Sequence, residues 1–194
     1  MIFEDLPTTP TSEELIDKAF SRAARAGKAK GGLEAQQSML QTAANIISDN
    51  LENVVTAWPD FAYEDDVHPF YYELADAIVD VDKLRQSLSE TMWASRKARE
   101  SHEEYQPRLR KTDVDTARKH RKQAFARLAD IVEQIDDELL YIKKSRNDLR
   151  DLPEINPDEP TIGVAGYPNV GKSSFVNDVT NARGETASYP FTTK

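Results

Sequence analysis

A short run near the C-terminal end of the sequence has the residue types and spacing of a loop that holds phosphate groups. Gly166, Gly171, Lys172 and Ser173 fit the pattern G-x-x-x-x-G-K-[ST]. The two glycines allow the backbone to curl so that its N–H groups converge on a phosphate. Lys172 adds a positive charge for the β- and γ-phosphates of a nucleotide, and the Ser173 hydroxyl is a ligand for Mg²⁺. The motif therefore predicts a nucleotide site that requires Mg²⁺.

The residues on either side of this loop have the order expected of a strand, a loop and a helix. Residues 161–166, TIGVAG, form a short run typical of a β-strand, and Phe175, Val176 and Val179 supply the apolar face of a following helix. The N-terminus of that helix presents its partial positive charge to the phosphate. Because a strand and a helix flank the motif, we interpret it as a true phosphate loop rather than a chance match.

A second segment, SYPFTTK at 188–194, contains two threonines some twenty residues beyond the loop. In GTPases a switch segment after the loop responds to the γ-phosphate and Mg²⁺. Thr192 and Thr193 are therefore candidates for a switch residue. From the spacing alone, a polar loop that merely contains two threonines is an equally good interpretation.

The sequence before the loop divides into a helical region and a linker. Pro153, Pro157 and Pro160 exclude a helix interior and predict a linker over 153–160. This linker separates a domain at 1–152 from residues 161–194. One strand and one helix cannot bury a core. We therefore expect 161–194 to be the incomplete N-terminal part of a nucleotide-binding domain (first strand, phosphate loop, first helix and first switch), and the 194-residue chain itself to be inactive.

The first 152 residues carry apolar side chains at helical spacing. Thr11 and Glu14 form a capping box that starts the first helix, and GKAKGG ends it by Gly31–Gly32. Two apolar stripes follow. The first consists of Leu40, Ala43, Ile47, Leu51, Val54 and Trp58, and the second of Leu74, Ile78, Val81, Leu84, Leu88 and Met92. We expect a break near Asp82 within the second stripe and an end at Pro107.

A heptad pattern over the last part of this region predicts one helix of roughly 35 residues. Its apolar positions are Phe125, Leu128, Val132, Ile135, Leu139, Ile142 and Leu149, and Arg146 fills the one polar position. Such a stripe must pack on partner helices, and the chain offers three upstream. The predicted fold is thus mainly α, an antiparallel helical bundle with long helices followed by the start of a P-loop α/β domain. A coiled-coil dimer is the alternative.

Composition limits the class of protein. The chain has no cysteine, which excludes disulfides and thiolate metal sites and favours a reducing compartment. It has no signal-peptide pattern and no apolar run long enough to span a membrane. The net charge is −9, which is also typical of salt-adapted proteins. We predict a cytoplasmic, monomeric protein with no membrane partner.

Residues 96–127 depart from the acidic character of the rest of the chain. They hold 11 basic and 5 acidic side chains. The candidates for contact with the RNA backbone are Arg108, Arg110, Lys111, Arg118, Lys119, Arg121 and Lys122. Arg22, Arg25, Lys28 and Lys30 form a smaller basic group. We expect two helices that meet near Pro107 to gather the larger group at one end of the bundle, where it would recognise RNA by shape and phosphate. An ordinary solvated helix surface is the alternative.

At GYPNVGKSSF (166–175) and YPFTTK (189–194) the sequence resembles the Obg-related GTPases, specifically the nucleolar GTP-binding protein (Nog) group. HPFYYELADAIVDVDKLRQSLS at 68–89 and LRDLPEINP at 149–157 resemble the N-terminal helical domain of that group. The resemblance covers most of the chain and is consistent with an archaeal relative. It implies a GTPase that acts in assembly of the large ribosomal subunit and docks on ribosomal RNA through its helical domain.

The resemblance also implies roles for individual residues. The nucleotide-binding positions are Gly166, Asn169, Val170, Gly171, Lys172, Ser173 and Ser174. Lys172 and Thr193 would be the catalytic residues, with Ser173 and Thr193 on Mg²⁺. Asn169 would help to coordinate a K⁺ ion beside the phosphates, although an Asn also suits a tight loop for structural reasons.

Two alternatives remain at this point. The D-x-x-G and N-K-x-D motifs of the family would lie beyond Lys194, so the residues at hand leave an ATP-specific relative open. The helical domain could also be an RNA- or protein-binding module in which the nucleotide domain is only regulatory.

Overall fold

A computed structural model describes residue 3 and residues 5–61, 67–150, 152, 159 and 162–180. The predicted linker prolines and the switch threonines Thr192 and Thr193 lie outside these residues. By its internal contacts the chain divides into two units, Met1–Leu152 and Pro153–Lys194.

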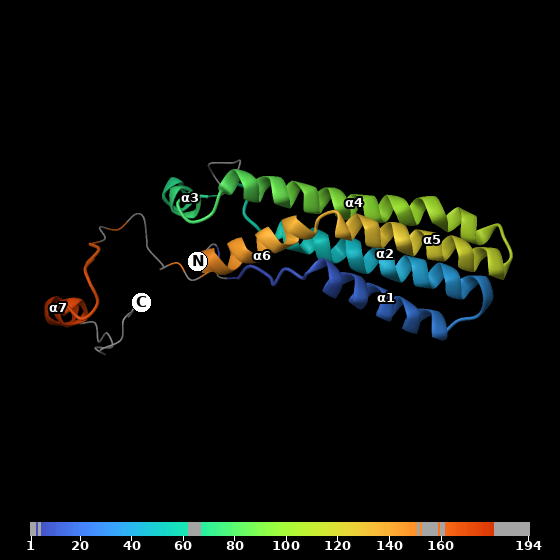
Figure 1. Ribbon diagram of the computed structural model, residues 1–194, viewed down its shortest axis with the longest axis horizontal. Coiled ribbons are helices and arrows are strands. Elements are labelled where there is room, and N and C mark those ends of the chain that lie inside the picture. The colour runs from blue at the N-terminus through green and yellow to red at the C-terminus, as the bar shows by residue number, and fades with distance from the viewer. Residues whose placement is uncertain are drawn as a thin grey trace. The chain divides into compact units, whose positions relative to one another are not determined.

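The first unit is an antiparallel bundle of helices, as the apolar stripes predict (Figure 1). Its helices are α1 (Ser12–Lys28), α2 (Gly32–Thr56), α3 (Pro69–Asp76), α4 (Val81–Arg110), α5 (Val114–Glu133) and α6 (Asp136–Arg150). α1, α2, α4 and α5 alternate in direction, and α6 continues the line of α5 (Figure 1). Within the described part of the chain, no helix is long and apolar enough to cross a membrane.

Local signals set the helix starts. Thr11 accepts from the Glu14 N–H while the Glu14 carboxylate accepts from the Thr11 N–H, which is the predicted capping box. Asp113 caps α5 by accepting from the N–H groups of Asp115 and Thr116. Hydrogen bonds from Thr116 lower the pKa of the Asp113 carboxyl to about 2. The α4–α5 turn is therefore fixed by one charged side chain.

The helix pair with the most extensive contact is α2 and α4. Ser48 on α2 and Ser95 on α4 are buried in this contact, and Ala44 and Ala98, about one helical turn from them on the same helices, are buried too. The Ser95 hydroxyl donates to the Ser48 carbonyl at 2.9 Å. Short side chains let two helix backbones approach closely, and the buried hydroxyl is satisfied by the neighbouring helix.

Two apolar clusters form the core. The first joins α1, α2, α4 and α5 around Leu40, Ile47 and Leu128. The second lies toward α3 and joins Phe3, Trp58, Phe61, Leu84 and Ile142. All six residues of the predicted stripe from Leu40 to Trp58 are buried, and Trp93 is partly buried.

The predicted helix of about 35 residues is wrong as a single helix. α5 ends at Glu133 and α6 starts at Asp136. Asp136, Asp137 and Glu138 crowd the first turn of α6, where acidic side chains stabilise a helix N-terminus. The Ser12 hydroxyl donates to the Asp136 carboxylate and ties this break to the start of α1.

The heptad side chains nevertheless stay on one face across this break. Leu128, Val132, Ile135, Leu139, Ile142 and Leu149 are all buried within the single chain. A dimeric coiled coil is thus not needed to cover them. Arg146, the polar position, donates through Nε to the Leu6 carbonyl at 2.7 Å and holds the N-terminal segment against α6.

Three further expectations about helix boundaries need correction. Pro107 does not end a helix but lies inside α4, where buried Tyr105 and Leu109 on either side hold the last turns to the core. Asp80, and not Asp82, caps the N-terminus of α4, because its carboxylate accepts a hydrogen bond from the Lys83 N–H. Ile78, assigned to the apolar stripe, falls in this break and is 41% exposed, while Ala75 and Val79 are buried instead.

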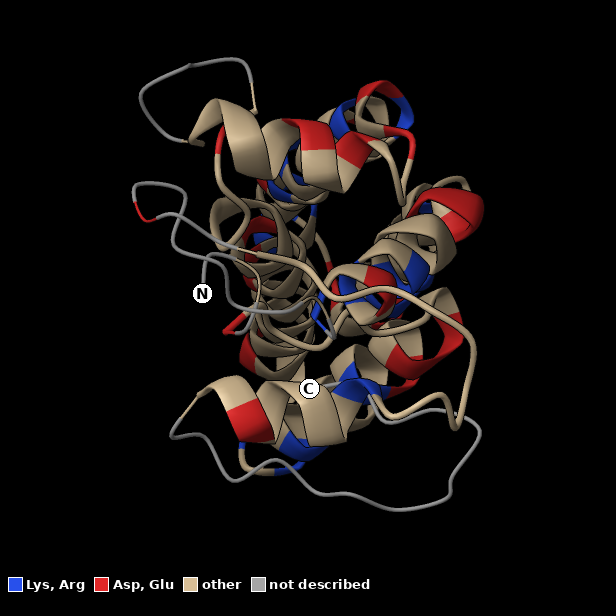
Figure 2. Cartoon of the chain, turned by 90° about the vertical axis from the view of Figure 1, so that its left-hand side faces the viewer, with Lys and Arg blue, Asp and Glu red and all other residues tan. Residues whose placement is uncertain are grey.

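Both acidic and basic residues lie on the helices of the bundle (Figure 2). Several form ion pairs at helical spacing, such as Lys30 with Glu34 at 2.9 Å and Lys144 with Asp148 at 3.2 Å. These pairs are exposed, so each contributes little to stability.

The α2–α4 contact gives the first testable prediction. Ala98→Leu places a larger side chain where the two backbones approach, and we expect the free energy of unfolding to fall by about 1–3 kcal/mol. Urea unfolding followed by circular dichroism measures this change. Ala126→Leu, at an exposed position on α5, is the matched control and should stay within about 0.5 kcal/mol of the wild type. Equal stability of the two variants would contradict close packing at Ala98.

Candidate phosphate-binding site

The second unit contains the loop that the motif predicts. Residues 162–167 have no regular secondary structure, residues 168–171 turn, and α7 (Lys172–Val179) follows. The strand expected over 161–166 is not formed in the described part of this unit, since a segment becomes a strand only by pairing with another. The turn and the helix follow in the expected order.

The turn uses two backbone conformations that most residues avoid. Asn169 has φ 62° and Gly171 has φ 88°, both in the left-handed region. Gly tolerates this region freely and Asn better than most other residues. The structure therefore supports the structural interpretation of Asn169, and it explains why Gly171 precedes the helix.

Lys172 lies across the loop. Its ammonium donates to the carbonyl of Gly166 at 2.8 Å and to that of Tyr167 at 2.7 Å. The positive charge is thus held inside the turn, next to the start of α7 and its free N–H groups. Ser173 is half-buried in the first turn of α7, and Ser174 is exposed.

This arrangement fits a nucleotide phosphate. A turn with two left-handed residues, a lysine ammonium and a helix N-terminus converge on one place, and each favours an anion. A Cβ at Gly166 would meet Val170 at 3.5 Å and the Lys172 side chain at 3.7 Å, so the loop is already closely wrapped at its first glycine. Val170, also predicted in the site, is 62% exposed.

The apolar side chains on either side of the loop are exposed. Ile162 is 90% exposed, Phe175 55% and Val179 61%. Side chains of this kind on an extended segment and its following helix are the ones that a parallel sheet buries.

The predicted RNA-binding residues lie in the first unit, around the α4–α5 turn. This turn is beside the α1–α2 turn, where a Cβ on Gly32 would approach Val114 at 4.0 Å (Figure 1). The two basic groups that are separate in the sequence therefore share one end of the bundle. We call this the basic end: Arg22, Arg25, Lys28, Lys30, Arg108, Arg110, Lys111, Arg118, Lys119 and Lys122.

The residues of the basic end differ in their availability. Arg110, Lys111, Lys119 and Lys122 are exposed and form no ion pair within the described part of the chain. Two others are paired to carboxylates along their own helices, Arg118 with Asp115 at 3.1 Å and Arg108 with Glu104 at 2.8 Å.

Arg121 is not a surface cation like its neighbours. It is half-buried, its guanidinium lies 5.2 Å from the Phe125 ring centroid, and Nη1 approaches the Met39 sulfur at 3.5 Å. Burial lowers the pKa of Arg121, and the nearby Arg118 lowers it further. Arg121 therefore serves the packing between α2 and α5.

Two family models match the chain in series. Residues 3–156 match the NOG1 N-terminal helical domain, and residues 161–194 match the 50S ribosome-binding GTPase. The first match covers most of the chain and the bundle described above.

Three relatives are similar to this chain over three quarters or more of its length. An uncharacterized protein of Methanocaldococcus jannaschii is 33% identical over 202 residues, which cover 99% of this chain and 57% of that protein. Nucleolar GTP-binding protein 1 of Eremothecium gossypii is 30% identical over 203 residues, which cover 99% of this chain and 31% of that protein. The same protein of Drosophila melanogaster is 35% identical over 147 residues, 75% of this chain and 22% of that protein. The chain thus spans just over half of the archaeal relative and a third or less of these eukaryotic ones.

The loop geometry gives the second prediction. In a protein that carries the complete GTPase domain, Gly171→Ala forces a side chain into the left-handed region, and we expect GTP affinity to fall by about tenfold or more. Titration with a fluorescent GTP analogue measures it. Gly163→Ala is the matched control, because a Cβ there meets no atom within 4 Å and the backbone is not left-handed. Equal GTP affinity of the two variants would contradict a requirement for the left-handed backbone conformation at Gly171.

Proposed function

This chain belongs to the nucleolar GTP-binding protein 1 family, and we propose that it supplies the helical domain and phosphate loop of a GTPase that acts on the large ribosomal subunit. The observation that carries the proposal is the loop at 166–173, in which Lys172 and the start of α7 face one wrapped turn. The match of residues 161–194 to the 50S ribosome-binding GTPase supports GTP as the substrate and the large ribosomal subunit as the place of action.

The residues of the loop divide the work of holding the nucleotide. The backbone N–H groups from Gly166 to Ser174 bind phosphate oxygens, and Lys172 exchanges its two carbonyl acceptors for the β- and γ-phosphates. The Ser173 hydroxyl and Thr193 would hold Mg²⁺, which would supply positive charge to the phosphate oxygens.

The exposed apolar side chains of the second unit are consistent with this function. Ile162, Phe175 and Val179 would pack against the remaining strands and helices of a GTPase domain. Those further elements would also carry the guanine-reading residues. GTP rather than ATP is favoured here by the family to which the chain belongs.

The function is tested in a protein that carries the complete domain. We expect Mg²⁺-dependent hydrolysis of GTP in preference to ATP, and Lys172→Ala should lower kcat/KM by about a hundredfold or more, since it removes a charge that stabilises the transition state. Phosphate release measures both. Lys144→Ala, exposed on α6, is the control. Equal rates of ATP and GTP hydrolysis would contradict specificity for GTP. If Lys172→Ala left hydrolysis unchanged, the loop at 166–173 would not be the site of hydrolysis.

Asn169 has a further proposed role as a ligand of K⁺. Its side-chain carbonyl is a neutral oxygen donor next to the phosphate loop, and its backbone conformation, φ 62°, is already fixed. We expect GTP hydrolysis to be faster in KCl than in NaCl at equal ionic strength, and Asn169→Ala to remove this difference. Asn169→Gly preserves the backbone conformation but removes the side-chain carbonyl, so it separates the structural role of Asn169 from its role as a K⁺ ligand. A salt-independent rate in wild type would leave Asn169 with its structural role alone.

The helical domain is the proposed contact with ribosomal RNA, through the basic end. Lys111, Lys119 and Lys122 are exposed and unpaired within the described residues, so reversing them should not disturb the fold. We expect the triple change to Glu to weaken binding of structured RNA about tenfold or more and to flatten its dependence on salt. Arg121 is left intact because it packs against Phe125.

The matched control for the RNA experiment lies away from the basic end. Lys83, Arg85 and Lys144 are exposed near the start of α4 and on α6, and reversing them changes the net charge by the same amount. Filter binding at several salt concentrations compares the two triple variants. If both lose the same affinity, the net charge of the bundle, and not the basic end, determines RNA binding.

A further inference from the structure

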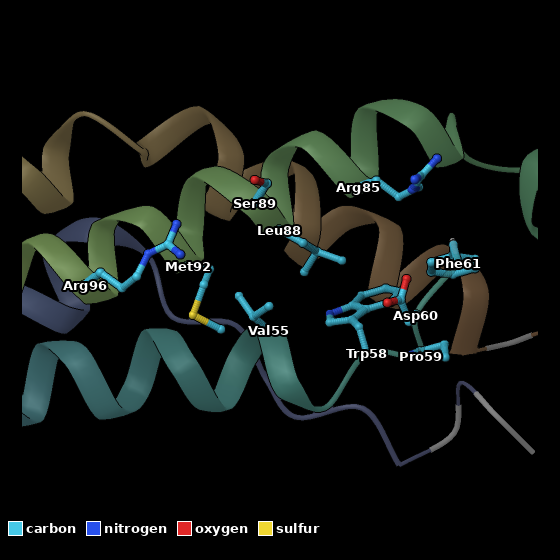
Figure 3. A pocket seen from close by; sticks show the side chains of 10 residues that line it. All are labelled: Val55, Trp58, Pro59, Asp60, Phe61, Arg85, Leu88, Ser89, Met92 and Arg96. Carbon is cyan, nitrogen blue, oxygen red and sulfur yellow. The ribbon is translucent and has the colours of Figure 1, made fainter. Parts of the chain in front are cut away.

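A groove lies between the C-terminal end of α2 and the first half of α4, toward the end of the bundle opposite the basic end (Figures 1 and 3). It encloses about 440 Å³, within the range of pockets that hold ligand groups. Neither the phosphate loop nor the basic end contributes a residue to it. The function proposed above therefore leaves it unexplained.

The floor of the groove is apolar. Leu88 and Met92 reach from α4 toward Val55 and Trp58 at the end of α2 (Figure 3). Val55 and Met92 are only partly buried, so an incoming apolar side chain gains contact with them. Methionine adapts its shape to different partners, which makes such a floor suitable for a protein side chain.

Two arginines stand at the ends of this floor. Arg85 and Arg96 are both exposed on α4 and are separated by eleven residues, about 16 Å along the helix axis. Arg96 forms no ion pair within the described part of the chain, and Arg85 approaches only the exposed Asp82 at 3.4 Å. Asp60 is the one acidic residue among the described residues that line the groove, so this lining carries an excess of positive charge.

The aromatic lining argues against RNA as the occupant. Single-stranded bases bind proteins by stacking on exposed aromatic rings. The aromatic residues of the lining, Trp58 and Phe61, are each 7% exposed, so neither offers a free ring face. An apolar floor with a positive charge at each end instead matches an apolar side chain flanked by carboxylates.

We propose that this groove binds an acidic segment of a partner protein, with a leucine or phenylalanine on Val55 and Met92 and a carboxylate on Arg96. The distance between the two arginines corresponds to three turns of a helix, so an amphipathic helical segment laid along α4 would place carboxylates near both. This interaction is independent of nucleotide binding and of the basic end.

The probe is a set of synthetic peptides of about 12 residues, a length chosen to span the groove as a helix, that carry leucine or phenylalanine anchors between glutamates. Matched sets replace every glutamate by lysine, or every anchor by alanine. The full 194-residue chain is used with Trp93→Phe, so that Trp58 is its sole tryptophan and reports on the groove by fluorescence. We expect members of the acidic set to bind and shift the Trp58 emission, and neither matched set to do so.

Arg96→Glu is the decisive variant, because Arg96 is exposed and its replacement should leave the melting curve unchanged. We expect this variant to bind the acidic peptides about tenfold or more weakly than the protein with Arg96, and to bind the lysine peptides more tightly than the acidic ones. Lys122→Glu, at the basic end, is the control and should have no effect. Met92→Ala tests the apolar floor separately, with the melting curve as the check on folding.

The proposal is overturned by any of three results. The first is that lysine peptides bind as well as acidic ones, or that no acidic peptide binds. The second is that Arg96→Glu leaves binding unchanged. The third is that a single-stranded oligouridine, added without peptide, shifts the Trp58 emission of the protein with Arg96 but not of Arg96→Glu, which would assign the groove to nucleic acid.

Discussion

The contact between α2 and α4 depends on side chains that are too small to keep the two backbones apart. Ser48 and Ser95 meet in this contact, Ala44 and Ala98 are buried about one helical turn from them, and both apolar clusters of the core include residues from these two helices. The hydroxyl of Ser95 is satisfied by the Ser48 carbonyl, so the polar atom costs little when buried. α1, α5 and α6 pack against this pair.

The direction of α2 and α4 brings the α1–α2 and α4–α5 turns to one end and leaves the groove toward the other. Basic residues that lie far apart in the sequence, such as Lys28 and Lys122, become part of one surface by this means. α2 ends at Thr56, so the residues that follow it are not helical. Trp58 and Phe61 in this following segment form part of the groove lining. The same helix pair thus accounts for a charged surface and for an apolar one.

The sequence predicted the helix faces better than the helix boundaries. Periodicity identifies which side chains face the core. The heptad positions from Leu128 to Leu149 are buried as predicted, even though the helix is interrupted at residues 134 and 135. It does not detect that interruption, because two helices in line preserve the same repeat. Pro107 misled the prediction because the cost of a proline depends on packing of its neighbours Tyr105 and Leu109. The phosphate loop was predictable because backbone conformation at Asn169 and Gly171 is encoded locally. The burial of Arg121 was not, since it depends on Met39, which is 82 residues away in the sequence.

The two bonds that α6 makes to the N-terminal segment join residues very far apart in the chain. Asp136 binds Ser12 across 124 positions, and Arg146 binds Leu6 across 140. Contacts of this kind form only after a long loop has closed, whereas the α1–α2 and α4–α5 hairpins form between neighbours. During synthesis the hairpins are thus available early, and the bundle is completed only when α6 emerges, shortly before the phosphate loop emerges. Folding of the helical unit and appearance of the nucleotide site would then follow each other closely on the translating ribosome.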